Sequence, residues 1–491
     1  MSWKEAAEPV LTRMPGVTRP EGHVPFKRKM GWTLGVLLVY FFLTNVYLWG
    51  LPSAGAGQDI FGQFRSILAG SQGTILQVGI GPIVTASIVL QLLGGAGLLG
   101  LDTNDPRDQV LYQGLQKLLV IVMVALTAFP MVFLGGFLPV SPELAATYGQ
   151  MTIQMLIFAQ VFVGGILILF LDEIVSKWGV GSGIGLFIIA GVSQRLLGGL
   201  FAWGGLPGEA GIIPTWFSIL FGQESFPSLL TGEGIQALFL GQGALLAIIT
   251  TVFIFVVVVY AESVRVEIPL SHARVKGARG RFPVKLIYAS VLPMILVRAV
   301  QMNVQFLGRI LDSQLGGSMP AWLGVYDGQG QPTSGLFYYL KPIQSPEEWM
   351  WWLGEASQAV WQIMLRVGID LAVMVIGGAI FAIFWVETTD MGPEATARQI
   401  QNSGMQIPGF RQNVGVYEKV LGRYIPQVTV IGGALVGLLA VMANMLGTIG
   451  AVSGTGLLLA VSITYKLYEE IAEEQMMEMH PMMREMFGGG R

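Results

Sequence analysis

Long apolar segments alternate with short polar stretches along almost the whole chain. A helix needs about 20 consecutive apolar residues to cross the hydrocarbon core of a bilayer. By this criterion the pattern predicts ten membrane-spanning helices, five in each half of the chain. They begin near Trp32, Thr74, Tyr112, Met151, Gly183, Gln242, Lys285, Ala359, Tyr424 and Ala451.

The second predicted span contains three residues that disrupt helices, Gly79, Gly81 and Pro82. A simple lipid anchor needs only apolar length. Irregular backbone is tolerated at membrane depth where protein covers it or where it lines a cavity. This span is therefore typical of a passage, or of a seam between helices that move.

The two predicted halves show faint internal similarity. Pro82 in the second span corresponds to Pro293 in the seventh, and residues 181–185 (GSGIG) correspond to residues 453–457 (SGTGL). Five spans in each half give the halves opposite orientations. Inverted repeats of this kind recur in transport proteins, whose pathway lies between the repeats. Chance similarity between Gly-rich helices is the alternative explanation.

The charge distribution determines the predicted topology. Of the 28 Lys and Arg residues, 22 lie in segments that are cytosolic if the N-terminus is cytosolic, as the positive-inside rule requires. Both termini are therefore expected in the cytosol. The predicted segments are a cytosolic N-terminal segment (1–30), an N-terminal half (31–203), an external loop (204–238), a C-terminal half (239–468) with cytosolic loops at 261–284 and 386–421 and an external loop at 307–358, and a cytosolic tail (469–491).

Composition indicates an all-α polytopic membrane protein, because 53% of the residues are hydrophobic, 12% are charged and the mean hydropathy is +0.62. The chain has no cysteine, which excludes disulfides, thiolate metal sites and cysteine nucleophiles. It also lacks the G-x-x-x-x-G-K-[ST] loop that holds nucleotide phosphates. We expect no metal and no cofactor, and we expect a partner to supply the driving force.

The middles of the broken spans indicate what a pathway could carry. A transporter of ions or polar solutes needs polar or charged groups near the membrane midplane, and this chain offers few. A ring of branched aliphatic side chains would instead block water and ions by dewetting. Ordinary helix packing is one alternative, and a secondary transporter of a small solute is the alternative function. The candidates for such a ring are Ile80, Val84, Ile184, Ile188, Leu292, Ile295 and Leu459.

Residues 58–69, between the first two spans, are too few to cross a membrane. Their apolar side chains follow the spacing of a short amphipathic helix. Such a helix could lie on the outer membrane surface or fold back to close a cavity. The candidate residues are Asp59, Ile60, Phe61, Phe64, Ile67 and Leu68.

Charged residues also occur inside the predicted spans. Arg298 lies in the seventh span, and Arg366 and Asp370 lie one turn apart in the eighth. Because an unpaired charge in lipid is costly, the sequence predicts a salt bridge between Arg298 and Asp370. A pair between Arg366 and Asp370 within one helix is the alternative.

An enzymatic function is not expected from the candidate nucleophile. The sequence Gly181-Ser182-Gly183 resembles a membrane serine-protease motif, but a Ser–His device needs a histidine within the fold. The chain has three histidines, all in segments predicted to be cytosolic: His23, His272 and His480.

Six ordered stretches, spread over the whole chain, resemble the SecY family in its archaeal form. SecY is the central subunit of the protein-conducting translocation channel, and its archaeal form is similar to the eukaryotic alpha subunit. The stretches are VPFKRKMGWT from Val24, VGIGPIVTASIVLQLL from Val78, LDEIVSKWGVGSGIGLFIIAGVSQ from Leu171, YAESVRVEIPLSHARVKGARGRFPVKLIY from Tyr260, FWVETT from Phe384 and GTGLLLAVSITYKLYE from Gly454.

The resemblance implies two five-helix halves around an hourglass pore. A lateral gate would lie between the second and third spans on one side and the seventh and eighth on the other. The family's pore ring falls on the seven aliphatic residues named above, and its plug helix falls on residues 58–69. The gate's polar residues would be Thr85, Gln116 and Ser290, although Val291 stands where relatives often have a polar residue.

The resemblance also implies a mechanism and partners. A hydrophobic signal sequence would leave sideways into lipid, whereas a polar chain would displace the plug and cross the ring. The expected partners are SecE, a small beta subunit, signal peptides, the signal recognition particle receptor pathway, membrane lipids and a ribosome with its nascent chain. Ribosomal RNA phosphates would meet Arg274, Lys276, Arg279 and Arg411, which the positive-inside rule alone also explains. The expected location is the cell membrane.

Overall fold

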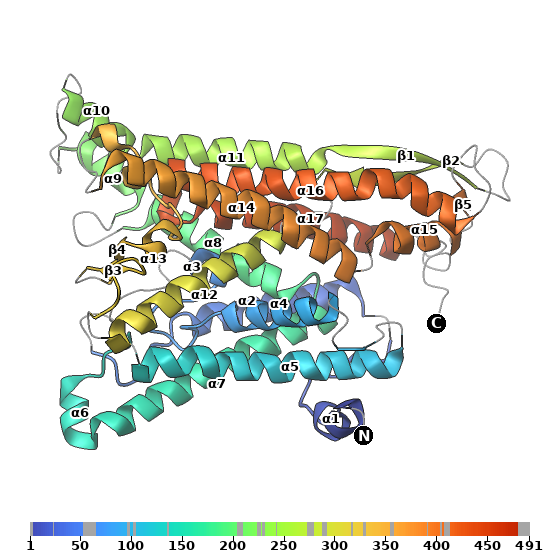
Figure 1. Ribbon diagram of the computed structural model, residues 1–491, viewed down its shortest axis with the longest axis horizontal. Coiled ribbons are helices and arrows are strands. Elements are labelled where there is room, and N and C mark those ends of the chain that lie inside the picture. Colours follow the sequence, from blue (N-terminus) through green and yellow to red (C-terminus); the bar gives the residue numbers. More distant parts are fainter. Residues whose placement is uncertain are drawn as a thin grey trace.

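The computed structural model describes residues 3–22, 24–52, 65–95, 99–101, 105–134, 137–203, 210–222, 227, 231–241, 243–272, 279–286, 292–315, 318–327, 330–353, 358–389, 391–402, 405–406 and 413–479. Long helices dominate it, and most of them run along the long axis of the molecule (Figure 1). Residues 287–291, which include Ser290 and Val291, lie outside the described part of the chain.

Each predicted span has a corresponding helix. Six of these helices are long and apolar enough to cross a membrane by length and composition: α5, α7, α8, α11, α14 and α16. Helices α2, α5 and α16 begin before their predicted starts, because polar residues continue each helix beyond its apolar part. Helices α4, α11, α12 and α17 begin after their predicted starts, and α4 follows Gly79, whose φ is +59°. The bounds are α2 (Phe26–Leu43), α4 (Gly81–Gly95), α5 (Pro106–Phe129), α7 (Gln150–Trp178), α8 (Gly183–Phe201), α11 (Leu245–Ser263), α12 (Leu292–Leu315), α14 (Val360–Thr388), α16 (Val414–Leu446) and α17 (Gly454–Met479).

Shorter elements lie at the two ends of the long helices. One end carries α1 (Trp3–Leu11) and α15 (Pro393–Asn402). The other carries α6 (Pro142–Tyr148), α9 (Ile212–Leu220), α10 (Gly232–Phe239), α13 (Leu336–Tyr339), β3 (Val325–Tyr326) and β4 (Pro332–Ser334). The helix α3 (Arg65–Leu68) lies inside the molecule, and a π-helical turn, Pro130–Leu134, extends α5.

A small sheet, which the sequence pattern did not predict, extends from the end of α11. Its strands β1 (Arg265–His272) and β2 (Arg279–Lys285) pair antiparallel, and β5 (Met405–Gln406) pairs with β1. Polar and apolar residues alternate in both long strands, as expected for a half-buried sheet. The two loops predicted at 261–284 and 386–421 therefore meet in one structure.

Glycines permit close packing between α14 and α16. A Cβ atom added to Gly433 would lie 2.6 Å from the carbonyl oxygen of Gly378. One added to Gly437 would lie 2.3 Å from the carbonyl oxygen of Met374. Small residues permit such close backbone approach in membrane proteins. The pair forms a tightly packed wall in the C-terminal half.

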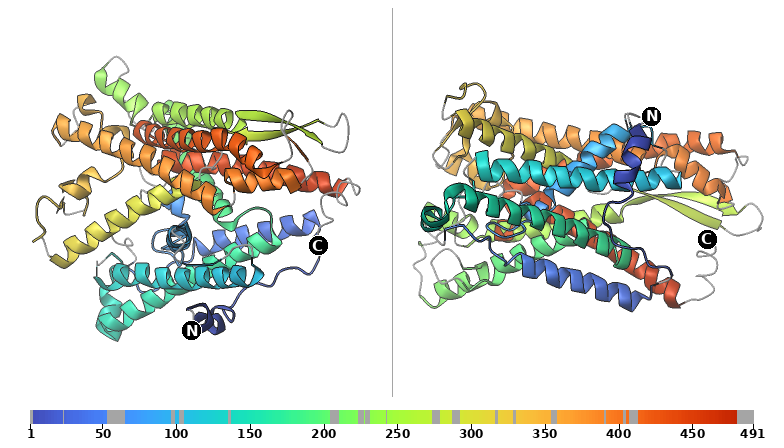
Figure 2. Two further views of the ribbon diagram at one scale, coloured as in Figure 1. Left: turned by 45° about the vertical axis from the view of Figure 1, so that its right-hand side comes forward. Right: turned by 90° about the horizontal axis from the view of Figure 1, so that it is seen from below.

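The helices of the two halves occupy opposite sides of the molecule. In Figure 1, α2, α5 and α7 lie below, and α11, α14, α16 and α17 lie above. The left view in Figure 2 shows the same division from another direction. Helix α4 contacts α12 and α14, and α8 contacts α17, so these contacts form the seam between the halves.

Candidate pore and lateral gate

The predicted ring residues gather in one buried hydrophobic cluster at the seam. Ile184 and Leu292 are partly buried in it, and the other five side chains are almost completely shielded from solvent. None of the seven side chains has a polar atom, so the cluster offers water and ions no hydrogen bonds. The residues come from both halves: Ile80 and Val84 at the start of α4, Ile184 and Ile188 in α8, Leu292 and Ile295 in α12, and Leu459 in α17.

Two local features position the ring residues. Gly79 has φ +59°, and a Cβ atom there would lie 2.2 Å from the carbonyl oxygen of Leu68. This close approach lets the backbone N–H of Ile80 donate to that oxygen at 2.8 Å. In α8 of the same half, the backbone N–H of Ile184 donates a hydrogen bond to Asp172 Oδ1 at 2.9 Å. Gly79 is therefore needed for the hydrogen bond between Ile80 and Leu68.

The described end of the predicted plug is folded into the molecule. Helix α3 contacts α8 and α17, and Ile67 is 2% exposed within the same hydrophobic cluster as the ring. Leu68 is buried in a neighbouring cluster. Of the two placements considered for residues 58–69, the structure shows the inward one for this end. The other predicted plug residues lie outside the described residues: Asp59, Ile60, Phe61 and Phe64.

A polar contact crosses the seam at the predicted gate. Asn303 Nδ2 in α12 donates to Thr85 Oγ1 in α4 at 3.4 Å. Gln116 Nε2 in α5 instead donates to Ser87 Oγ in α4 at 3.4 Å, within one half. The sequence analysis did not identify Asn303. The amides of Gln301, Asn303 and Gln305 in this helix were the available signal, but nothing in the sequence indicates which of them faces α4.

The predicted contact between Arg298 and Asp370 is present in the interior. Arg298 Nη1 lies 3.5 Å from Asp370 Oδ1. Both side chains are buried, with 2% and 1% of their surface exposed. Gln301 joins them, accepting from Arg298 Nη1 at 2.7 Å and donating to Asp370 Oδ1 at 3.2 Å. A backbone N–H, that of Ile343, donates to Asp370 Oδ2 at 3.3 Å.

Two further polar residues extend this cluster to α16 and α17. Arg298 Nε donates to Thr455 Oγ1 at 3.1 Å, and Asn444 Nδ2 donates to the same oxygen at 3.3 Å. The backbone N–H of Thr455 donates to Asn444 Oδ1 at 3.2 Å. The whole cluster therefore belongs to the C-terminal half. It fixes α12 to α14, α16 and α17 rather than to the opposite half.

Arg366 has partners other than Asp370 in the described structure. Its Nη2 atom lies 2.6 Å from Glu348 Oε2, and its Nε atom donates to the carbonyl oxygen of Lys341 at 3.0 Å. Lys341 Nζ also lies 3.6 Å from Glu348 Oε1. Burial lowers the pKa of the Lys341 ammonium, and the Glu348 charge opposes that shift. The within-helix alternative for Arg366 is thus replaced by an ion pair with the preceding loop.

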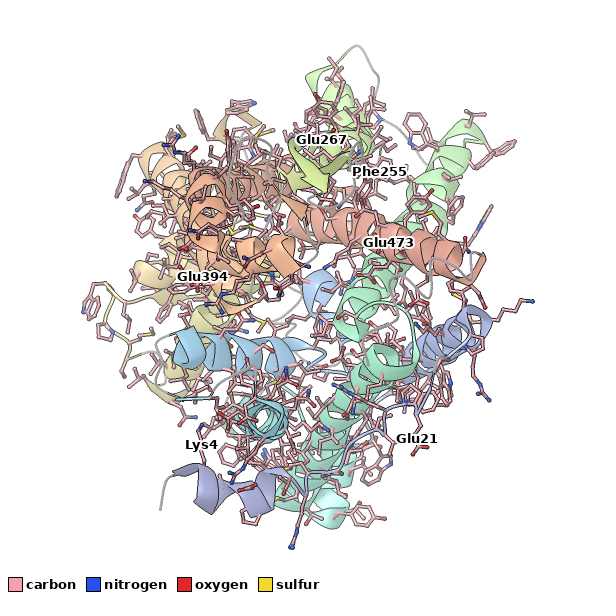
Figure 3. The ribbon with its side chains drawn as sticks, turned by 90° about the vertical axis from the view of Figure 1, so that its right-hand side faces the viewer. Lys4, Glu21, Phe255, Glu267, Glu394 and Glu473 are labelled. Atoms are coloured by element: carbon pink, nitrogen blue, oxygen red, sulfur yellow. The ribbon has the colours of Figure 1, made fainter. Side chains whose placement is uncertain are left out.

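Charged groups surround the end of the molecule that carries the sheet. Figure 3 looks onto this end, where Lys4, Glu21, Glu267 and Glu394 lie toward the outline and Glu473 of α17 lies nearer the middle.

Two ion pairs anchor α17 at this end. Lys285 Nζ at the end of β2 lies 2.5 Å from Glu469 Oε2, and Lys29 in α2 pairs with Glu474. Arg279 begins β2 opposite Ser271. The other predicted ribosome-contacting residues lie outside the described residues: Arg274, Lys276 and Arg411.

Comparison with known proteins agrees with this arrangement. The family model described as SecY matches residues 74–468, and that described as the plug domain of Sec61p matches residues 38–73. The chain is 74% identical to the protein translocase subunit SecY of Halobacterium salinarum, over 100% of both chains.

Solved structures give the same result. One described as a protein conducting channel has a TM-score of 0.77 and 37% identity, covering 96% of this chain and 98% of that one. Sec61 in the canine ribosome-channel complex from the endoplasmic reticulum has a TM-score of 0.74 at 37% identity, with the same two coverages. The chain therefore belongs to the SecY family of protein translocase channel subunits.

Proposed function

We propose that translocated polypeptides cross the membrane through the seven-residue ring. The supporting observation is that both halves contribute apolar side chains to one buried cluster. A gasket without polar atoms can close around many different sequences while excluding water and ions. We propose that residues 58–69 act as the plug on this ring, because the described end of that segment packs against it.

Hydrophobic segments would leave through the seam between α4 and α5 on one side and α12 and α14 on the other. A segment whose transfer from water to hydrocarbon is favourable partitions into lipid. The same hydrophobicity scale identifies membrane spans. The hydrogen bond between Asn303 and Thr85 crosses this seam. We infer that it is one of the contacts that must break before a signal sequence can pass. Gln116 and Ser290, the latter outside the described residues, remain further proposed gate residues.

We further propose that the end carrying the sheet faces the cytosol, with both termini on that side. The excess of Lys and Arg in these segments supports this orientation. The expected complex contains SecE and a small beta subunit, and signal peptides reach it through the signal recognition particle receptor pathway. The family consists of translocation channel subunits, so we propose no catalysis by this chain.

The absence of native cysteine makes a crosslinking test direct. A single cysteine at Val84 or Ile188 should form a disulfide with a cysteine in a ribosome-stalled secretory chain. The crosslinks should follow the length of the nascent chain and require its signal sequence. A cysteine in the predicted cytosolic loop at 261–284 is the control position. Crosslinks to a cytosolic loop position without any at the ring would favour the small-solute transporter.

Ribosome binding should depend on the basic loop tips. We propose that Arg274, Lys276, Arg279 and Arg411 contact RNA phosphates, as the ribosome-bound canine relative suggests. Replacing all four with Ala should weaken ribosome affinity. It should also reduce the slope of log affinity against log salt by about 3, at roughly 0.7 to 0.9 per phosphate contact.

The matched control for this experiment is Arg265→Ala at the start of β1. Arg265 is paired with Glu267 at 3.5 Å and lies far from the predicted loop tip, so its loss should leave the slope unchanged. Equal slopes for the fourfold variant and the wild type would show that these residues serve topology alone.

A further inference from the structure

Tyr40 in α2 makes a buried contact with the end of the proposed plug. Its side chain is 1% exposed, and its hydroxyl donates to the carbonyl oxygen of Ala69 at 2.9 Å. Its ring stacks on Phe187, with centroids 5.0 Å apart and planes at 21°. Phe187 precedes the ring residue Ile188 in α8. Tyr40 therefore connects α2, the plug end and the helix that supplies the ring.

Ala69 has an unusual backbone conformation. Its φ is +51°, in the left-handed region that residues with a Cβ atom normally avoid. It is 1% exposed, so its carbonyl oxygen has no access to bulk water. The preceding carbonyl, that of Leu68, accepts from the N–H of Ile80 at 2.8 Å. Two consecutive carbonyl groups at the plug end are thus held, one by α2 and one by the ring.

We propose that Tyr40 is a positioning residue that holds the plug end in its seat, and that Ala69 is the joint at which the plug is released. The proposal rests on the assignment of residues 58–69 as the plug. Strained backbone persists only where the surrounding contacts determine it. Loss of the Tyr40 hydrogen bond lets Ala69 return to a common conformation. The hydroxyl of Tyr40 therefore biases the channel toward its closed state.

Tyr40→Phe tests the hydroxyl alone, because the ring and its stacking on Phe187 remain. The test variant also carries Ala69→Cys as the single thiol in the chain. The rate at which a water-soluble maleimide labels this buried thiol reports release of the plug end. Loss of one hydrogen bond should speed labelling about two- to tenfold in the idle channel. Tyr47→Phe, at an exposed tyrosine, should leave the rate unchanged.

Ala69→Gly should act in the opposite direction, since glycine adopts positive φ without a steric penalty. In vesicles containing the idle channel, Tyr40→Phe should raise ion leakage, and adding Ala69→Gly should lower it again. Two equalities would overturn the proposal: the same labelling rate in Ala69→Cys with and without Tyr40→Phe, and the same leakage in Tyr40→Phe as in the wild type.

A reversible crosslink tests whether the plug end must move. A Cβ atom at Gly191 in α8 would lie 3.9 Å from the Cβ atom of Ala69. This separation falls in the range for disulfides. The variant Ala69→Cys/Gly191→Cys, when oxidised, should block passage of a secretory chain, and reduction should restore passage. The single variant Gly191→Cys should conduct under both conditions.

The two failures can be told apart. Normal passage through the oxidised, fully crosslinked channel would overturn the positioning role, because the joint would then be immobile during transport. If a channel with a single cysteine at Val84 or Ile188 and native Tyr40 and Ala69 shows no ring crosslinks to the nascent chain under oxidising conditions, the proposed path through the ring is wrong.

Discussion

Asp370→Ala is expected to lower the free energy of unfolding by about 3 to 5 kcal/mol, the usual cost of breaking a buried ion pair by removing one partner. Arg298 would remain charged and buried, since it is 2% exposed and 3.5 Å from the lost carboxylate. Gln301 and the backbone N–H of Ile343 would also lose an acceptor. Equilibrium unfolding of the purified protein in mixed micelles measures the loss.

A double replacement separates charge from packing. Arg298→Met/Asp370→Leu removes both charges and keeps much of the side-chain volume, so it should recover most of the stability lost by Asp370→Ala. The cluster joins helices of one half only and does not cross the gate. The double variant should therefore also recognise signal sequences as the wild type does. A loss smaller than about 1 kcal/mol for Asp370→Ala would mean that Arg298 finds water instead.

Gly437→Ala should destabilise the protein by about 1 to 3 kcal/mol through overpacking. The added methyl group would lie 2.3 Å from the carbonyl oxygen of Met374, which belongs to the backbone of α14 and cannot rotate away. The matched control is Gly422→Ala in the same helix, where nothing lies within 4 Å of the added atom. The control should be neutral or stabilising, because alanine is the better helix former. Thermal unfolding of both variants measures the difference. Equal unfolding temperatures for the two variants would contradict the overpacking explanation.

The spans and the ring could be predicted because each depends on a property that is local in sequence. Length and hydropathy identify a span. The ring was predicted as an aliphatic set because broken, apolar spans leave few other candidates for a lining. The pair of Arg298 with Asp370 followed from the cost of an isolated charge in hydrocarbon. The same reasoning offered Arg366 only Asp370, in its own helix, because nothing local in the sequence indicates that Glu348, which precedes that helix, folds back onto it.

The missed features depend on contacts between distant segments. The strand β5 pairs with β1 across more than a hundred residues of chain, and its two residues carry no strand signal of their own. Asn303 meets Thr85 only because α12 crosses α4 at that level. The bond from Tyr40 to Ala69 depends on how residues 65–70 turn back between α2 and α8. Hydrophobic periodicity predicts which face of a helix is buried. It does not predict which residues of two packed helices lie opposite each other.

Helix α17 connects the ring residues to the small sheet. It carries Leu459 in the ring and Glu469, which is paired with Lys285 at the base of the hairpin. Ten residues of α-helix separate these contacts by about 15 Å. A load placed on the hairpin by a docked partner is therefore borne by the same stiff rod that supplies one side of the constriction. A change in the position of α17 would therefore affect both the docking hairpin and the width of the ring. The contact of α17 with α8 is where such a movement would be resisted.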